Sequence, residues 1–400
     1  MVEIIRKGEL PQPFEVPERL RQAAAAALSV TLREPRPAGF PLLFTADFEL
    51  IEPAIAFLHE HGVQRAHTSD TVRTYSEILH DWFDTVEQNG IDWRAADATD
   101  LVAYRNLMLT EVSAHTGRPY SIRTINHRVR GTLRFYTWAV RNGWLRSSAL
   151  ATRATDAILA RARYDRARWA RKSDPDRSIF LLRQFESLPR PLTGAQACEL
   201  LTRLRPPYDL MARWQLYTGL RVSELLRLMV ADVSKRSKLQ NSDDAPAHHV
   251  IDVLRKGRKS GYVIAPATLL DETDAYRSLH RHAWLKRAQR LRGASDRQTL
   301  FLNTRGSPVT RNWYQQQIAR AGKGSGFKAT THLLRSTFAC MMLARLEQIA
   351  KRGAPINPLL IVKVLMGHEH IDTTDRYLRA IAVETYVLNE ILDSLLSARS

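Results

Sequence analysis

Apolar residues recur at helical spacing between residues 66 and 148, and this period constrains the fold more than any other feature of the chain. The first run, which ends before Gly90, consists of Val72, Tyr75, Ile78, Leu79, Trp82, Phe83 and Val86. It follows capping residues at positions 68–70, and a second helix is expected after Asp100. Because this spacing excludes alternating strands, residues 66–150 are predicted to form a helical domain.

A third helix is expected from Ile122 to about Asn142, with Ser121 as its cap and Gly143 as its end. At 100° per residue, one group of basic side chains on this helix falls within an arc of about 60°. The group is Arg123, His127, Arg130, Arg134 and Arg141. Solvated charged faces are common but usually mix signs, and this stripe contains no acid. We therefore interpret it as a face that contacts phosphates.

The flanking regions have different compositions. Residues 1–65 are predicted to be an N-terminal extension with one or two helices, one of them from Phe48 to His61. Residues 151–191 are rich in Arg and Ala and are expected to be a basic linker. Residues 192–400 are predicted to be a second, mainly helical domain.

This second domain contains one short β region. Its strands, His249–Leu254 and Gly261–Ile264, flank a basic turn that contains a glycine. The polar segment Lys235–Pro246 precedes them and is expected on a surface loop. The predicted fold is therefore mainly α with a small β-sheet.

The chain of 400 residues has a net charge of +18, and 48 of its 59 basic residues are arginine. Guanidinium groups pair bidentately with phosphate, which favours a polyanionic partner, although a GC-rich genome also raises the content of Arg and Ala.

Two cysteines exclude a disulfide framework and a cysteine-built zinc site, and they are expected to be buried thiols. Apolar stretches are far shorter than the roughly 20 residues of a membrane span, so a cytoplasmic protein is expected.

Three separated segments carry residues suited to chemistry on a phosphate. They are Tyr217–Leu225 with the pattern Thr-Gly-x-Arg-x-x-Glu, Thr331–Ala339 with His-x-x-Arg, and Leu365–His368 with Gly-His, followed by Tyr377 nine residues later. In order, spacing and flanking residues, they resemble the tyrosine recombinase (phage integrase) family. The resemblance covers about residues 193–385, and the preceding helical region is similar to the family's core-binding domain less specifically.

Chemistry gives a reason for each residue type. Direct attack on a phosphodiester needs a nucleophile, cations for the non-bridging oxygens and an acid for the departing 5′ oxygen. An ordinary tyrosine is about one part in a thousand ionised at neutral pH, so nearby cations must help it lose its proton. Exchange of a phosphodiester for a phosphotyrosyl ester keeps the bond energy. Neither ATP, a metal nor another cofactor is therefore expected.

The resemblance implies a role for each matching residue around the phosphate. Tyr377 would be the nucleophile that forms a 3′-phosphotyrosyl link, and Arg221 and Arg335 would clamp the scissile phosphate. His368 would hydrogen-bond that phosphate. Glu224 would orient the site from behind these residues.

Two further residues are assigned to proton transfer. His332, one helical turn before Arg335, would act around the tyrosine. Lys256, in the turn of the predicted hairpin, would protonate the leaving 5′ oxygen. Arg258 and Lys259 in the same turn are expected to contact DNA. For any one of these residues alone, an ordinary structural role is as good an explanation, but the set taken together favours catalysis.

The family also implies partners and assembly. The two principal domains would close around double-stranded DNA as a C-shaped clamp, and a homotetramer would act through a Holliday junction. The apolar helical face of Ile381–Leu396 would cover its own domain or pass to a neighbouring protomer. The extension and the insert favour a mobile-element integrase or transposon recombinase at the bacterial nucleoid.

Other functions remain open from the sequence. A catalytically idle DNA-binding factor could keep the fold, although binding alone does not require the tyrosine. An Xer-like dimer resolvase shares the same motifs. A type IB topoisomerase shares the chemistry, but the Gly-His segment and the tail favour a recombinase.

Overall fold

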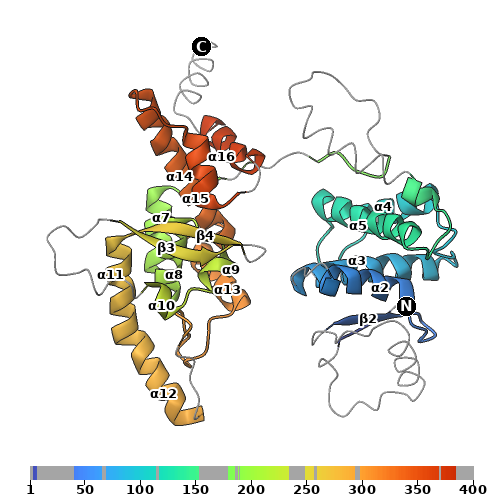
Figure 1. Ribbon diagram of the computed structural model, residues 1–400, viewed down its shortest axis with the longest axis horizontal. Helices are drawn as coiled ribbons and strands as arrows, with labels where there is room; N and C mark the ends of the chain where they lie inside the picture. Colours follow the sequence, from blue (N-terminus) through green and yellow to red (C-terminus); the bar gives the residue numbers. More distant parts are fainter. Residues whose placement is uncertain are drawn as a thin grey trace. The chain divides into compact units, whose positions relative to one another are not determined.

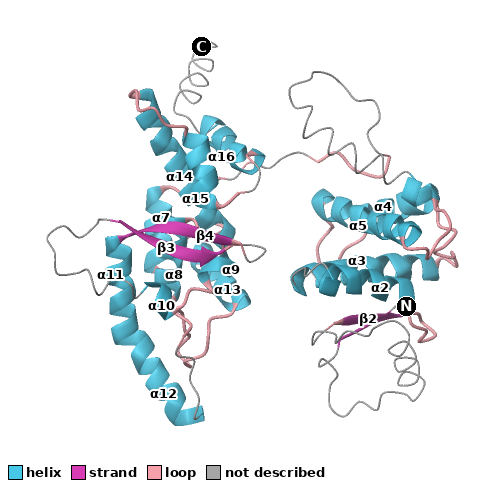
Figure 2. Ribbon diagram, viewed as in Figure 1, coloured by secondary structure: helices cyan, strands magenta, loops and turns pink. Residues whose placement is uncertain are grey.

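The computed structural model describes residues 3–6, 40–64, 69–113, 117–152, 179–184, 188, 190–233, 248–255, 259–292, 298–368 and 371–383. The chain divides into an N-terminal unit, Met1–Phe185, and a C-terminal unit, Glu186–Ser400. Helices dominate both units, and each contains a two-stranded antiparallel sheet (Figures 1 and 2). The prediction of a mainly α fold with a small sheet is confirmed.

The N-terminal unit begins with a sheet that the sequence did not predict. Strands β1 (Glu3–Arg6) and β2 (Pro41–Phe44) pair antiparallel. Helix α2 follows at Glu52–His59 and continues as a π-helical turn, η1 (Glu60–Gln64). The helix expected from Phe48 therefore starts later than predicted, because Phe48 adopts a positive φ of 61° and Pro53 lies in the first turn.

Three longer helices complete this unit: α3 (Ser69–Gln88), α4 (Ala98–Thr110) and α5 (Ile122–Arg141). Helix α4 starts before Asp100 rather than after it. Asp97 is its cap, accepting from Thr99 N at 2.6 Å, and Asp100 accepts from Asp97 N at 2.8 Å. Helix α5 has the predicted cap, since Ser121 Oγ accepts from Thr124 N at 3.1 Å.

Aromatic side chains fill the core of this unit. Trp82 and Tyr136 are fully buried, and Trp82 Nε1 donates to Tyr136 Oη at 3.1 Å. The same core includes Phe40 and Phe57, which the sequence assigned to a separate extension. In the structure, the described part of residues 40–64 thus packs with the helical domain rather than apart from it.

Part of the predicted linker also packs here. Phe180 is buried in the core, and Leu182 is held by Asn126 of α5. The Asn126 side chain donates to Leu182 O at 2.8 Å and accepts from Leu182 N at 2.9 Å. Residues 179–184 are therefore bound to the N-terminal unit, because the amide matches both polar groups of the backbone.

The C-terminal unit begins with helices α7 (Gly194–Thr202), α8 (Tyr208–Thr218), α9 (Val222–Leu225) and α10 (Val230–Val233). The predicted hairpin follows as β3 (His248–Leu254) and β4 (Ser260–Pro266), each strand one or more residues longer than expected. Val253 pairs with Gly261 in its register. The insert Lys235–Pro246 lies outside the described residues.

The remaining helices are α11 (Ala267–Tyr276), its continuation η4 (Arg277–Arg281), α12 (His282–Arg292), α13 (Arg311–Gly324), α14 (Thr331–Lys351), α15 (Pro358–Met366) and α16 (Asp372–Val383). Helices α14, α15 and α16 gather at one end of the unit, while α11 and α12 run away from the sheet at the other (Figure 1). Cys340 of α14 is buried as predicted, but Cys198 of α7 is exposed, contrary to the prediction. Beyond residue 383, the predicted tail helix lies outside the described part of the chain.

We expect Asn126→Ala to lower the free energy of unfolding of the full chain by about 2 kcal/mol, because it leaves both polar groups of Leu182 without this partner. Urea unfolding followed by tryptophan fluorescence measures the change. Asn89→Ala is the control, since this exposed side chain makes a single bond to Thr85 O and its loss should cost less than about 0.5 kcal/mol. Equal losses in both variants would contradict the buried role of Asn126.

Candidate active site

Two helices of the C-terminal unit end next to each other, each at a glycine in the left-handed conformation. Helix α8 ends at Gly219, with φ 67°, and α15 ends at Gly367, with φ 59°. A Cβ at Gly219 would lie 2.5 Å from Phe338 Cδ1 and 2.9 Å from Met366 Sδ, so only glycine fits there. The last carbonyl groups of each helix lack partners within it and form the negative end of its dipole. This place therefore favours cations.

Arginine side chains bind these carbonyl groups. Arg335, on α14, donates through Nη1 to Gly219 O and through Nη2 to Met366 O at 2.6 Å. Arg221, the cap residue of α9, donates through Nη2 to Gly367 O at 3.1 Å. The two arginines that the sequence assigned to the phosphate clamp thus meet at the same pair of helix ends. Arg335 is only 3% exposed, whereas the side chain of Arg221 is 29% exposed.

One buried carboxylate lies between the guanidinium groups. Glu224, only 2% exposed, accepts from Arg221 Nη1 at 2.7 Å and from Arg255 Nη1 at 3.3 Å. Its Oε2 lies 3.9 Å from Arg335 Nη1 and also accepts the backbone N–H of Arg221 at 2.8 Å. Glu224 thus lies within 4 Å of all three guanidinium groups.

His368 and Tyr377 lie against this arginine cluster. His368 Nε2 is 3.3 Å from Arg335 Nη2, and its Nδ1 is 2.9 Å from Thr374 Oγ1. Because a guanidinium only donates, Nε2 accepts, and the imidazole proton is on Nδ1. The His368 ring stacks on that of Tyr377 in α16, with centroids 6.1 Å apart and planes at 14°. Tyr377 is 5% exposed, so the predicted nucleophile is held inside the site.

The electrostatics of the cluster favour a neutral imidazole among charged arginines. Burial and the adjacent Arg335 and Arg221 lower the pKa of His368 to about 3. Burial and the nearby Arg221 lower the pKa of Arg335 to about 9, while Glu224 and Tyr377 act in the opposite direction. Arg335 therefore stays charged at neutral pH. The effect of Tyr377 on Arg335 also means that the phenol lies within electrostatic range of that guanidinium.

The other predicted residues are placed less completely. His332 lies exposed on α14 and contributes to the lowered pKa of His368, which shows that it lies near the cluster. Lys259, which directly precedes β4, is exposed. Lys256 and Arg258 lie outside the described residues.

Arg255 is a member of the cluster that the sequence analysis did not single out. It is 7% exposed and donates through Nη2 to Tyr262 O at 2.6 Å and to Leu365 O at 2.9 Å. A signal was available, because Ile251, Val253 and Arg255 share the buried face of β3 and its extension at a period of two. The basic turn around Arg255 obscured that signal.

The basic stripe of α5 forms as predicted on the N-terminal unit. Arg123, His127, Arg134 and Arg141 are exposed, and Arg130 is half-buried. Burial and the neighbouring Arg134, Arg130 and Arg123 lower the pKa of His127, so these side chains lie close together. Arg134 also donates to Tyr75 Oη at 2.6 Å, which fixes the direction of the Arg134 side chain.

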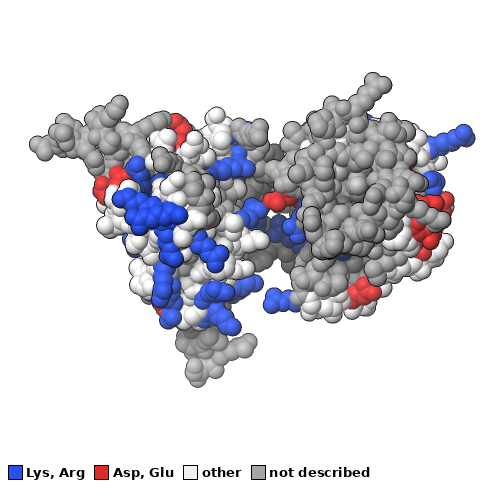
Figure 3. All heavy atoms as spheres, turned by 90° about the horizontal axis from the view of Figure 1, so that it is seen from below, with Lys and Arg blue, Asp and Glu red and all other residues white. Residues whose placement is uncertain are grey.

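On the C-terminal unit, the face seen from below carries more Lys and Arg than Asp and Glu (Figure 3).

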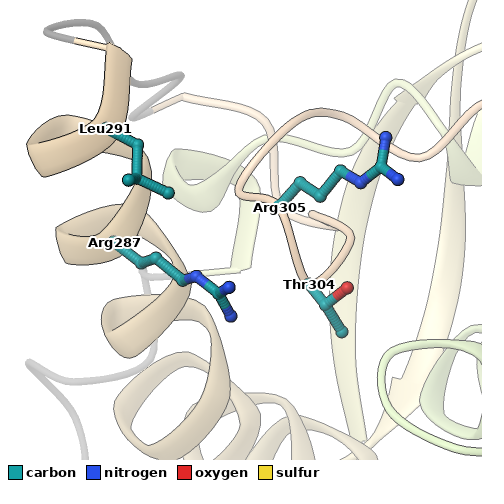
Figure 4. Close-up of a pocket in the computed structure, with 4 residues that line it drawn as sticks. All are labelled: Arg287, Leu291, Thr304 and Arg305. Atoms are coloured by element: carbon teal, nitrogen blue, oxygen red, sulfur yellow. The ribbon is translucent and has the colours of Figure 1, made fainter.

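A cavity of about 550 Å³ lies apart from this cluster. Arg287 and Leu291 of α12 extend toward Thr304 and Arg305 across it (Figure 4). None of these four residues belongs to the predicted catalytic set.

Within the described ranges, no helix is long and apolar enough to cross a membrane. In the same ranges, no group of three or more His, Cys, Asp or Glu side chains could hold a metal ion.

The chain is similar to known proteins. Residues 191–382 match the phage integrase family. The tyrosine recombinase XerC of Halalkalibacterium halodurans is 25% identical over 324 residues, which are 80% of this chain and 90% of that protein. The tyrosine recombinase XerC of a Roseiflexus species is 27% identical over 332 residues, covering 80% of this chain and 87% of that protein.

Solved structures share the fold. The XerH site-specific recombinase in a post-cleavage complex with a palindromic difH substrate has a TM-score of 0.53 at 15% identity, covering 94% of this chain and 93% of that one. A lambda integrase dimer bound to a COC′ core site has a TM-score of 0.51 at 13% identity, covering 92% and 89%. The matching family and the similarity to XerC proteins over most of the chain identify a site-specific DNA recombinase. Residues 191–382 form a domain of the phage integrase family, the tyrosine recombinases.

The lowered pKa of His368 predicts a stability that depends on pH. Between about pH 6.5 and pH 3, the unfolded chain binds a proton that folded His368 does not, so the free energy of unfolding falls as the pH is lowered. We expect His368→Gln to reduce this slope by up to about 1.4 kcal/mol per pH unit. Urea unfolding at several pH values measures it, with His282→Gln on exposed α12 as the control. Identical slopes in wild type and His368→Gln would refute the assignment.

The stripe on α5 predicts a salt-dependent contact. We expect Arg123→Ala combined with Arg141→Ala to reduce the log–log slope of DNA affinity against salt by about 1.8, because each lost phosphate contact removes about 0.9. Fluorescence anisotropy with a labelled duplex measures the slope. Arg73→Ala is the control, because this exposed arginine of α3 pairs with Glu77 at 2.9 Å. An unchanged slope in the double variant would exclude the stripe from the DNA interface.

Proposed function

We propose that this protein cuts and rejoins DNA at a specific recombination site through a 3′-phosphotyrosyl intermediate on Tyr377. The observation that carries the proposal is the meeting of Tyr377, His368 and Arg335 in a single chain. Arg335 is held by backbone carbonyl groups, so its direction is fixed before a phosphate arrives. Such preorganisation is what stabilises charge that develops in a transition state.

In the proposed reaction, the phosphate approaches the exposed side of Arg221. The positive charge of the nearby Arg335 also attracts it. The Tyr377 oxygen attacks the phosphorus, and the bond from phosphorus to the 5′ oxygen breaks. His332 takes part in removing the phenol proton, and Lys256 donates a proton to the 5′ oxygen. In its present tautomer, neutral His368 cannot donate a hydrogen bond to a phosphate, because its proton is on Nδ1, which faces Thr374. A hydrogen bond from His368 to the phosphate therefore requires a change of tautomer or protonation of Nε2.

Recombination would join two DNA sites through a Holliday junction in a homotetramer. Because nucleophile and arginines meet within one chain, we infer that each protomer cleaves with its own tyrosine. The tail after residue 383 would then serve assembly rather than supply the nucleophile. For the biological role, we propose a mobile-element integrase or transposon recombinase, supported by the long segment before residue 66 and the polar insert.

An Xer-like role is the second candidate. It is favoured by the similarity to XerC proteins, which extends over 80% of this chain and so includes part of the N-terminal unit. The two roles differ in substrate. A recombinase of a mobile element acts on the ends of that element, whereas a dimer resolvase acts on a chromosomal site. Cleavage assays on both kinds of duplex separate them.

The central test uses nicked duplex suicide substrates that trap the covalent complex. We expect wild type to form an adduct that resists SDS and is sensitive to protease, and Tyr377→Phe to form none, a loss of more than about 10³-fold. Tyr208→Phe is the control, because its ring stacks on Tyr314 away from the cluster and the adduct should persist. An adduct in Tyr377→Phe would identify another nucleophile. Tight binding with no adduct in wild type would favour an idle DNA-binding factor.

A further inference from the structure

Arg255 ties three segments of the C-terminal unit together at one guanidinium group. Nη1 donates to Glu224 at 3.3 Å, and Nη2 donates both to Tyr262 O at 2.6 Å and to Leu365 O at 2.9 Å. Glu224 lies in α9 at the end of the Thr-Gly-x-Arg-x-x-Glu pattern, Tyr262 lies in β4, and Leu365 lies in the last turn of α15. The side chain therefore links the hairpin to the cluster that holds Arg221 and His368.

The surrounding backbone leaves space for this one side chain. A Cβ at Gly261 would lie 2.8 Å from Arg255 Cγ and 2.9 Å from its Nε. A Cβ at Gly367 would lie 3.0 Å from the same Nε. Two glycines from separate elements thus accommodate Arg255, and both terminal nitrogens of its guanidinium donate to oxygens of the protein. These contacts explain the position of Arg255 without a phosphate.

Arg255 also fixes the start of the turn that follows it. Its backbone N–H donates to Lys259 O at 2.8 Å, which closes the hairpin across residues 255–259. Lys256 is the next residue along the chain, so the anchoring of Arg255 limits where the backbone of Lys256 can begin. No DNA-facing contact of Arg255 itself is needed for this effect.

We propose that Arg255 is a positioning residue, which anchors the hairpin to Glu224 and the end of α15 so that Lys256 reaches the leaving 5′ oxygen. The inference rests on the proposed function, because it assumes cleavage through Tyr377 with Lys256 as the acid. It assigns to Arg255 a role on the leaving-group side of the reaction. The guanidinium acts through the backbone that it holds in place, and other residues contact the reacting atoms.

The test compares an ordinary substrate with one whose leaving atom is sulfur, a 5′-bridging phosphorothiolate. A thiolate departs without a proton, because thiols are far more acidic than alcohols. We expect Arg255→Met to cleave the ordinary duplex about 100-fold more slowly and the phosphorothiolate within about threefold of wild type. Lys256→Ala should show the same pattern, and Kd for DNA should stay within about threefold in both variants.

Two further variants guard against a general loss of structure. Arg213→Met removes an ion pair with Glu272, at 2.8 Å, in the same unit and should cleave both substrates as wild type does. Arg255→Gly with Gly261→Arg returns a guanidinium from the neighbouring strand and should recover at least about tenfold of the lost rate. Equal slowing of Arg255→Met on both substrates, with an unchanged thermal midpoint, would overturn the positioning role. Failure of wild type to cleave even the phosphorothiolate would instead refute the proposed function.

Discussion

The buried carboxylate of Glu224 is the interaction on which the C-terminal unit depends. Three guanidinium groups lie within 4 Å of it, and two of them are almost fully buried. Without an anion among them, their mutual repulsion and loss of hydration would oppose folding of this region. Removing one partner of such a cluster costs far more than the pair contributes in isolation, since charge is left buried without compensation. Glu224 thus allows arginines to gather before any phosphate is present.

Helix ends supply the rest of the support. The carbonyl groups of Gly219, Leu365, Met366 and Gly367 accept from Arg335, Arg255 and Arg221. These are groups that a helix cannot satisfy itself, and they carry the negative end of the dipole. The glycine caps turn the chain sharply enough for the carbonyls of α8 and α15 to converge. The Thr-Gly-x-Arg and Gly-His motifs therefore have a structural reason: glycine ends the helix, and the cation binds where it ends.

The sequence predicted the parts of this site that lie within single motifs. Arg221 and Glu224, or His332 and Arg335, are separated by about one helical turn, so local spacing suffices. It could not predict that Arg335 binds the carbonyl groups of two distant helix ends, because tertiary contacts carry no local period. Arg255 was missed for a related reason. Its burial follows from strand alternation, but a basic run more often signals a solvated turn.

The N-terminal unit shows the same limit. The helical period of α3 and α5 was strong enough to place both, and Ser121 capped α5 as expected. The pairing of β1 with β2 joins segments that are far apart in sequence, and nothing local in either segment specifies its partner. Likewise, Asn126 holds Leu182 through a contact across 56 positions. These long-range contacts hold residues 40–64 and 179–184 in the N-terminal unit.

The charge of the cluster suits a phosphate in reaction better than one at rest. Arg221, Arg255 and Arg335 with Glu224 leave two net positive charges among the described residues, while His368 is neutral. A phosphodiester carries one negative charge, and in the proposed reaction a second develops as the Tyr377 oxygen attacks before the leaving oxygen is protonated. Interactions that are stronger in the transition state than in the ground state are those that raise the rate. Because the backbone carbonyls hold the guanidinium groups in place, little reorganisation is needed when that charge appears. The same contacts that make this region stable would thus make it complementary to the transition state of the proposed reaction.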